Sequence, residues 1–106
     1  MRRNHSAAEV FAALGDETRL YLVKKLIDGE SHSISDLAEN SKITRQAVTK
    51  HLRVLQDVGL VKSTRLGRET LFELDARPLR DMQEYLNLIS SQWDESLHRL
   101  KAFVES

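Results

Sequence analysis

The amino-acid sequence predicts a mainly α-helical fold with one small β-hairpin, built as a single domain over residues 1–106. Apolar residues recur at helical spacing between residues 44 and 59, and again in a longer stretch from residue 79 to residue 104. Between these segments, strand-forming runs flank Gly67-Arg68, a pair with glycine first that is typical of a type II′ hairpin turn. A chain of 106 residues is long enough for one such domain and too short for two.

Two capped helices begin the expected fold. Ser6 can cap a helix that ends at Gly15, and Asp16 can cap a second helix that stops at Gly29, where a positive φ lets the chain turn away. Apolar residues at helical spacing mark the faces that we expect to be buried. They are Val10, Phe11 and Leu14 in the first helix, and Leu20, Val23, Leu26 and Ile27 in the second.

Two short helices across a tight turn are expected next. Residues 33–34 form an extended link, and Ser35 can cap a two-turn helix. A polar turn over residues 40–43 leads to Thr44, which can cap the helix of residues 44–58. This arrangement is a helix-turn-helix, whose second helix can enter the major groove of DNA. The inward residues of the first short helix are Leu37 and Ala38.

The helix of residues 44–58 has an apolar side and a polar side. The apolar side, which must pack on the domain, consists of Ala47, Val48, Leu52, Leu55 and Val58. The polar side, here termed the outer row, consists of Arg45, Gln46, Thr49, Lys50 and Arg53. These side chains suit base edges and phosphates in a major groove, although a solvated helix face has a similar composition. Gly59 can end the helix in a Schellman motif, with Leu60 against Leu55.

The hairpin spans residues 60–74. Phe72 and Leu74 share one face of its second strand, and we expect this face to pack on the helices. Arg65 and Arg68 lie at its tip. Two arginines at a hairpin tip are either part of a solvated turn or a probe of the DNA backbone and minor groove. The preceding helix-turn-helix favours the probe.

One long helix is predicted from about residue 76 to residue 104. Pro78 is tolerated only in its first turn, which agrees with a cap at Asp75 or just after it. Its near-heptad apolar seam consists of Leu79, Met82, Leu86, Ile89, Trp93, Leu97, Leu100 and Val104. Three further residues widen this stripe, so we expect a second chain to cover it; the alternative is a helix folded back on its own domain. They are Tyr85, Leu88 and Phe103.

Charge is balanced over the chain but unevenly distributed. Sixteen basic residues match sixteen acidic ones, whereas residues 42–70 carry seven basic side chains against two acidic ones, a local charge of +5. A basic third on an acidic body is the electrostatic pattern expected of a module that presents one face to DNA. A split of this size can also arise by chance in a chain with 30% charged residues.

Several function classes are disfavoured. The chain has no cysteine, which excludes disulfides, thiolate metal sites and cysteine nucleophiles. No run has the length of a transmembrane helix, and Glu9 interrupts the only apolar stretch near the N-terminus, so we expect a soluble cytoplasmic protein without a membrane partner. Without a phosphate-binding loop or a paired carboxylate in an evident cleft, we do not expect an enzyme.

Three segments closely resemble those of ArsR/SmtB-type winged-helix transcriptional repressors. They are ALGDETRLYLVKKL at residues 13–26, TRQAVTKHLRVLQDVGLV at residues 44–61 and RLGRETLFEL at residues 65–74. The resemblance extends over roughly Val10 to Phe103. Glu17 stands where the family commonly has proline, and either residue suits the first turn of a helix.

The resemblance implies a winged helix-turn-helix with N- and C-terminal dimerisation helices. It further implies a homodimer that binds a partly palindromic operator in double-stranded DNA and regulates transcription, as a repressor. Base edges would be contacted by Arg45, Gln46, Thr49 and Lys50, and phosphates by Arg53 and Arg68. Arg65, at the tip of the hairpin, is a further DNA-binding candidate. His51 either donates to a phosphate or covers the packing of Leu52 and Leu55. The implied dimer interface contains Val10, Phe11, Leu14, Leu86, Ile89, Trp93, Leu97 and Leu100.

Many relatives sense metals, and here the sequence departs from their pattern. Metal-sensing relatives place cysteines in or before the first helix of the helix-turn-helix. This chain has residues 31–37, SHSISDL, at that place. Other relatives bind zinc between terminal helices through Asp/His pairs, and this chain offers Asp94 with His98. Its histidines, at positions 5, 32, 51 and 98, show no ligand spacing. We therefore expect a non-metal branch without cofactor, in which Trp93 belongs to the dimer core.

Two alternative functions remain open from the sequence. One is a metal-responsive repressor with a zinc site between helices, and the other is a winged-helix module that binds an acidic protein. The sequence identifies no small-molecule effector.

Overall fold

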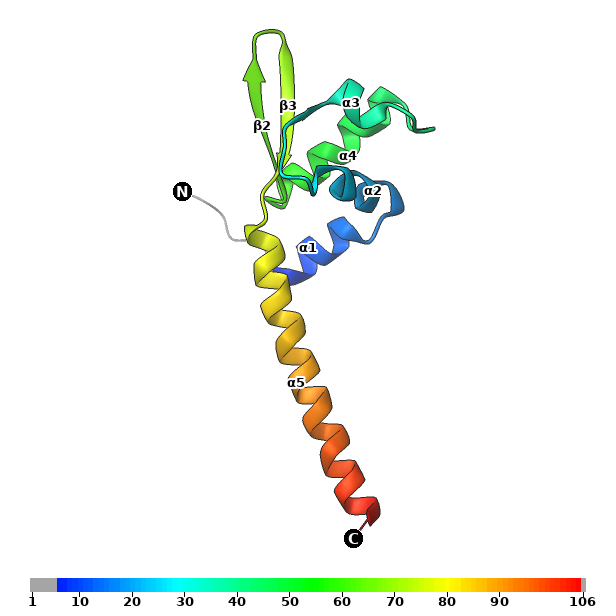
Figure 1. Cartoon of the computed structure of the whole chain (residues 1–106), viewed down its shortest axis with the longest axis vertical. Helices are drawn as coiled ribbons and strands as arrows, with labels where there is room; N and C mark the ends of the chain where they lie inside the picture. Colours follow the sequence, from blue (N-terminus) through cyan, green and yellow to red (C-terminus); the bar gives the residue numbers. More distant parts are fainter. Residues whose placement is uncertain (1–5, 106) are drawn as a thin grey trace.

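The computed structural model describes residues 6–105, and the short basic segment with His5 lies outside the described residues. This part of the chain forms five helices and three strands, and the strands make one sheet (Figure 1). In order they are α1 (Ala7–Leu14), α2 (Glu17–Leu26), β1 (His32–Ser33), α3 (Ile34–Ala38), α4 (Arg45–Asp57), β2 (Val61–Leu66), β3 (Glu69–Leu74) and α5 (Arg77–Glu105). The mainly α-helical fold with a small hairpin is confirmed.

The predicted N-caps of α1, α2 and α4 are formed as expected. The hydroxyl of Ser6 accepts the backbone N–H of Glu9 at 3.2 Å, and Asp16 Oδ2 accepts that of Arg19 at 3.0 Å. Thr44 Oγ1 accepts the N–H of Ala47 at 3.1 Å. These bonds satisfy backbone donors that no helical carbonyl can reach, and they fix where α1, α2 and α4 begin.

The prediction of Ser35 as the cap of α3 was wrong. The cap is Ser33, whose hydroxyl accepts the N–H of Asp36 at 3.1 Å, while Asp36 Oδ2 accepts the N–H of Ser33 at 3.2 Å. This reciprocal capping box needs an acidic or amide side chain three residues after the cap. Ser33 has Asp36 at that position, whereas Ser35 has Ala38.

A third strand was also missed. The expected extended link contains β1, which pairs antiparallel with β3 through His32 opposite Phe72 and Ser33 opposite Leu71. The sheet order is therefore β1-β3-β2, with the hairpin strand β3 in the centre. A two-residue strand leaves no alternation pattern in a sequence, so only the assembled sheet reveals it.

One hydrophobic core joins the helices to the base of the hairpin. Its fully buried members come from α2, α3, α4 and the start of the hairpin; they are Leu22, Leu26, Leu37, Val48, Leu52, Leu55 and Leu60. The expected burial of Leu20 and Ile27 was wrong, because their exposed fractions are 41% and 69%. Both lie roughly 100° around the helix from the centre of the arc that Leu22, Val23 and Leu26 bury against α4 and β3.

The end of α4 has the Schellman geometry that the sequence predicted. Gly59 has φ 78°, its N–H donates to the carbonyl of Gln56 at 3.0 Å, and the N–H of Leu60 donates to the carbonyl of Leu55 at 3.0 Å. Leu55 and Leu60 are both fully buried, which is the apolar contact that accompanies this motif. The turn directs the chain from α4 straight into the hairpin.

The hairpin, here termed the wing, projects from the domain. Its register pairs Leu66 with Glu69 and leaves Gly67-Arg68 as the loop. Gly67 has φ 64° and Arg68 is not among the described residues with positive φ, which is the type II′ pattern. Phe72 is buried, as predicted, whereas the part of β2 beyond Val61 is exposed on both faces. The wing therefore stands free of the core except at its base.

The long helix α5 leaves the domain at the end opposite the wing (Figure 1). Asp75 Oδ1 accepts the N–H of Arg77 at 3.1 Å, and Pro78 occupies the first turn as expected. Near its start Met82 is buried, and Tyr85 meets Phe11 of α1 with ring centroids 6.2 Å apart. The radius of gyration is 18.3 Å, against about 13 Å for a compact chain of this length, because most of α5 projects beyond the core. Among the described helices, none is long and apolar enough to cross a membrane.

Candidate DNA-binding surface

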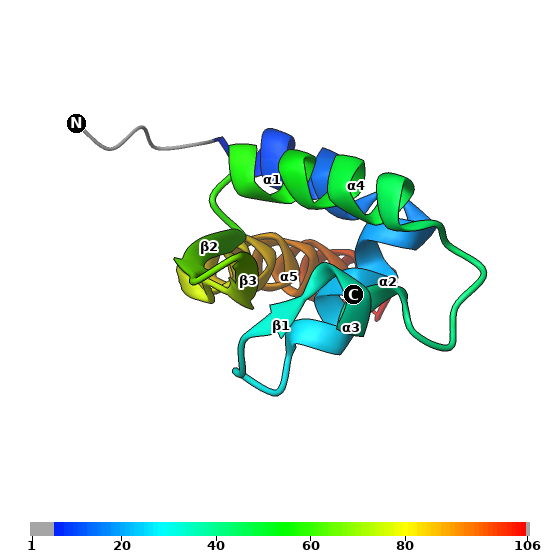
Figure 2. The ribbon, with the colours of Figure 1, turned by 90° about the horizontal axis from the view of Figure 1, so that it is seen from above.

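The outer row of α4 lies on the surface of the domain. Gln46, Lys50 and Arg53 are exposed and Thr49 is partly exposed, whereas Val48, Leu52 and Leu55 on the other side are buried. Seen from above, α4 runs along one edge of the domain, with the wing and α3 to one side of it (Figure 2). The helix can therefore approach a flat or grooved partner along its outer row without disturbing the core.

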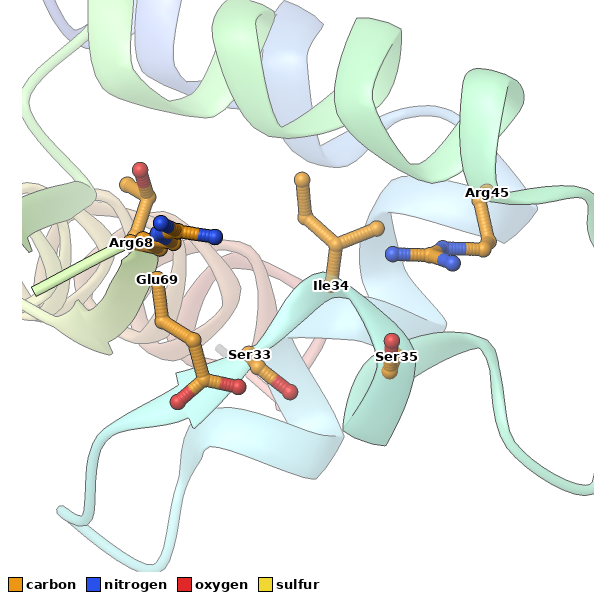
Figure 3. Close-up of a pocket in the computed structure, with 7 residues that line it drawn as sticks. Ser33, Ile34, Ser35, Arg45, Arg68 and Glu69 are labelled. Atoms are coloured by element: carbon orange, nitrogen blue, oxygen red, sulfur yellow. The ribbon is translucent and has the colours of Figure 1, made fainter.

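Arg45 is the exception in the outer row. At 100° per residue, Gln46, Thr49, Lys50 and Arg53 fall within an arc of roughly 100°, and Arg45 lies roughly 40° outside that arc. Its side chain is exposed and lines a pocket beside α3 instead (Figure 3). Arg45 thus differs in direction from the residues with which the sequence grouped it.

The hydroxyl of Thr49 donates its hydrogen bond within α4. Its Oγ1 donates to the carbonyl of Arg45 at 2.9 Å, the bond that threonine commonly makes to the preceding turn. The hydroxyl oxygen and the methyl group stay available, and these can accept from a base amino group or contact a thymine methyl.

His51 faces the junction of α1 and α2. Its Nδ1 is 3.7 Å from Asp16 Oδ2 and 3.4 Å from Arg19 Nη1, and its side chain is 24% exposed. Of the two roles that the sequence left open, this position favours packing inside the domain over contact with a phosphate. His51 instead links α4 to the first two helices.

Arg19 holds this junction together. Its Nε donates to the carbonyl of Ala13 at 2.6 Å, and Nη2 is 3.5 Å from the carbonyl of Ala12, so Arg19 caps the C-terminal end of α1. Asp16 caps α2, and the backbone N–H of Arg19 is the main cause that lowers the pKa of its carboxyl, with smaller contributions from the charges of Arg19 and His51. Arg19 lies within the segment of residues 13–26 that resembles the repressor family. Its side-chain partners lie on other elements, and no sequence pattern predicts them.

The wing carries the remaining candidate contacts. Arg65 and Arg68 are exposed near its tip, and Arg65 Nε donates to the carbonyl of Gly67 at 3.4 Å. Gln56 of α4, the recognition helix of the helix-turn-helix, donates from Nε2 to Ser63 Oγ at 2.9 Å. This bond between recognition helix and wing was not indicated by the sequence. It ties the positions of the two elements to each other.

Most of the positive charge on this surface is uncompensated. Lys62 lies 3.6 Å from Glu73, whereas Arg45, Lys50, Arg53 and Arg68 form no ion pair with another described residue. Cations without an internal partner keep their attraction for an external anion, so the geometry fits a polyanionic partner.

Comparison with known proteins identifies the family. Residues 16–63 match the family described as "Bacterial regulatory protein, arsR family". The solved structure of an ArsR-like transcriptional regulator from Rhodococcus sp. RHA1 superposes with a TM-score of 0.79 at 39% sequence identity, covering 92% of this chain and 91% of that one. The chain belongs to the ArsR family. It is therefore a DNA-binding transcriptional regulator with a winged helix-turn-helix fold.

Two relatives extend the comparison. The HTH-type transcriptional regulator YuzN of Bacillus subtilis, described as uncharacterized, is 34% identical over 85 residues, which cover 74% of this chain and 92% of YuzN. A transcriptional repressor SmtB homolog from Synechocystis is 40% identical over 67 residues, which cover 63% of this chain and 50% of that protein.

The ArsR-family chain exposes most of its apolar seam on α5. The implied interface residues Leu86, Ile89, Trp93, Leu97 and Leu100 are all exposed, and Trp93 is exposed to 66%. On α1, Phe11 and Leu14 are half-buried and keep some free surface. Val10 is only 4% exposed and belongs to the core of its own protomer, so it can add almost no area to an interface.

The candidate metal ligands do not meet within this ArsR-family protomer. No group of three or more His, Asp or Glu side chains that could hold a metal ion occurs among residues 6–105. Asp94 and His98 lie one turn apart on α5, on the side away from the apolar seam. His32 instead pairs with Asp28, Nε2 to Oδ2, at 2.9 Å.

Proposed function

We propose that this regulator is a cytoplasmic homodimeric repressor that binds a partly palindromic operator. In this arrangement α4 of each protomer enters a major groove, and the wings lie over the flanking backbone. Gln46, Thr49 and Lys50 contact base edges, and Arg53 contacts phosphate. The observation that carries the proposal is the exposed outer row of α4 beside a free wing, with cations that no described side chain neutralises.

The dimer is supported by the exposed apolar seam of α5. Soluble monomers rarely expose a continuous apolar stripe, and five of its residues between Leu86 and Leu100 are exposed in a single protomer. Near-heptad spacing suits packing against a second helix along the whole length. A partner with the same seam satisfies both requirements, because a twofold axis brings identical faces together.

Repression follows from occupancy of the operator. Two recognition helices on one rigid dimer bind two half-sites at once, so the affinity of the dimer exceeds that of one domain through effective concentration. A protein held in this way excludes other proteins from the same DNA. The relative from Synechocystis is named a transcriptional repressor, which supports this direction of regulation.

Selection of binding sites from random duplexes tests the proposal. We expect a partly palindromic sequence with half-sites about 10 base pairs apart, or a multiple of that distance, centre to centre. A scrambled duplex should bind on the order of 10³-fold more weakly at the same salt concentration. Equal affinity for the selected and scrambled duplexes would contradict sequence-specific binding.

Two arms of the same experiment address the alternative functions. Selection in the presence of zinc and in the presence of a chelator should give the same operator and affinity, and a metal-dependent affinity would instead support a zinc-responsive repressor. A module for an acidic protein should bind neither duplex tightly, so specific binding to the selected duplex excludes that alternative.

A further inference from the structure

A pocket lies between the recognition helix and the wing. It has a volume of about 210 Å³ and is lined by Ser33, Ile34, Ser35, Arg45, Arg68, Glu69 and Thr70. These residues come from the end of β1, the start of α3, the first residue of α4 and, in the wing, the loop and the start of β3. Figure 3 shows Arg45 and Arg68 on opposite sides of this pocket, with Ile34 between them. The space is sufficient for one phosphate group with water molecules.

The lining of the pocket consists mainly of hydrogen-bond donors. The guanidinium groups of Arg45 and Arg68 form no hydrogen bond or ion pair with another described residue, and the hydroxyls of Ser35 and Thr70 are likewise without a partner there. Glu69 is the one carboxylate in the lining, and Figure 3 shows it directed toward Ser33 and away from both guanidinium groups. Two such groups near each other repel unless an anion lies between them.

The chemistry of these donors selects the ligand. A phosphodiester carries one negative charge and only accepts hydrogen bonds, and the planar fork of arginine matches its two non-bridging oxygens. A base edge presents donors and acceptors in a fixed plane. To reach a base edge, Arg45 would have to point into the groove in the same direction as Gln46 and Lys50. Arg45 points beside α3 instead.

The position of the pocket agrees with this ligand. If α4 occupies a major groove and the wing reaches toward the neighbouring minor groove, the sugar-phosphate strand that separates the two grooves must pass between them. The pocket opens at that place in the fold, between the first turn of α4 and the wing loop.

We propose that Arg45 and Arg68 together bind one phosphodiester of the DNA backbone in this pocket. The inference rests on the proposed function and revises the role that the sequence predicted for Arg45: this residue fixes the position of α4 along the DNA and does not read a base. Recognition helix and wing then hold the same phosphate from two sides, which sets their common distance from the backbone.

Neutral backbone substitution tests this inference. In the selected duplex, phosphates are replaced one at a time by uncharged methylphosphonates, and binding is measured for the wild-type protein, Arg45→Gln, Arg68→Gln and the control Lys24→Gln. Lys24 is exposed on α2, away from the pocket. We expect one phosphate per half-site whose replacement weakens wild-type binding by on the order of tenfold. At that phosphate, replacement should weaken binding by Arg45→Gln or Arg68→Gln less than binding by the wild type, because each variant has already lost one of the two arginine contacts. The control Lys24→Gln should lose as much affinity as the wild type.

The same variants distinguish phosphate binding from base reading. Arg45→Gln should select the same sequence as the wild type and should reduce the slope of log affinity against log salt by about 1. A changed base preference at one position, or a methylphosphonate profile identical to that of the wild type, overturns the inference and leaves the proposed function intact. If the wild-type protein selects no sequence at all, the proposed function fails, and the inference fails with it. Thermal unfolding checks that each variant is folded.

Discussion

Gln46 and Lys50 are the residues on which base recognition depends in the proposed complex. Both are exposed on α4 and contribute nothing to the core, so their replacement by alanine should leave the thermal unfolding temperature almost unchanged. Each bidentate contact to a base contributes about 1–3 kcal/mol of discrimination. We therefore expect Gln46→Ala and Lys50→Ala each to relax preference at particular operator positions in a binding-site selection. An unchanged base preference would remove that residue from the reading surface.

Asp16 gives the fold a dependence on acid. Because its carboxyl has a lowered pKa in the folded protein, the charged form stabilises the fold above the ordinary value near 3.8, and this contribution disappears as pH falls through the lowered pKa. Serine also caps helices but carries no charge. Thermal unfolding of the wild type and Asp16→Ser, followed from pH 6 to pH 2, should show a difference that is greatest at the higher pH and vanishes at the lower. A constant difference over this range would contradict the assignment.

The directions of single side chains were the least predictable level of the structure. Periodicity correctly separated Lys50 and Arg53 from Val48 and Leu55, because the outer and inner faces of a regular helix follow from spacing alone. It could not predict that Arg45, one residue into the helix, turns toward a pocket made by other elements. The contacts of His51 with Asp16 and Arg19 were inaccessible for the same reason, since they join residues far apart in the sequence.

At the scale of the element, the start of α3 offers a direct test of the revised cap. Ser33→Ala removes the hydroxyl that accepts the N–H of Asp36 and keeps the backbone N–H that Asp36 accepts, whereas Ser35→Ala removes a hydroxyl that has no partner among the described residues. Loss of an N-cap typically costs about 1 kcal/mol. Urea unfolding should therefore show a lower free energy of unfolding for Ser33→Ala and almost none of this loss for Ser35→Ala. Equal losses would refute Ser33 as the cap.

Most helices and both long strands could be predicted because their signals are local. Thr44 as a cap, Gly59 as a left-handed residue and Gly67 in the hairpin loop each act within a few positions of their own element. The short elements were less predictable. β1 exists because β3 offers it backbone partners, and two residues carry too little pattern to indicate a strand. The second helix was placed correctly, but its buried face depends on where α4 and β3 lie.

For the whole molecule, Trp93 tests the proposed dimer. It is the largest side chain in the exposed part of the α5 seam, and aromatic residues at the centre of an interface commonly dominate its energy. We expect Trp93→Ala to shift the protein toward monomers in light scattering. Operator affinity should fall with it, because each monomer then binds a single half-site. The thermal unfolding temperature of the wild type should rise with protein concentration, because the folded dimer is favoured at higher concentration.

The matched control for this prediction lies on the opposite side of α5. Glu84 is exposed and falls away from the apolar seam, so Glu84→Ala changes the same helix without changing the proposed interface. The control should remain a dimer with wild-type operator affinity. If Trp93→Ala also remains a tight dimer, Trp93 is not part of the interface.

The exposed apolar stripe of α5 was the feature of the whole molecule that the sequence predicted best, because a stripe too long for one domain to cover follows from residue spacing. The pocket between recognition helix and wing had no such signal. Its seven lining residues come from four separate elements and become neighbours only after the core has positioned α3, α4 and the wing.

Packing of the long helix α5 also determines a distance in the proposed dimer. In the proposed dimer α5 supplies most of the contact between the protomers, so the way that two copies of α5 lie against each other sets the distance between the two α4 helices. A slip of one residue along α5 moves a protomer by about 1.5 Å, close to half of the 3.4 Å that separates successive base pairs. In the proposed dimer, packing of the near-heptad seam therefore determines the spacing between the two half-sites, and the residues that determine it do not contact the DNA.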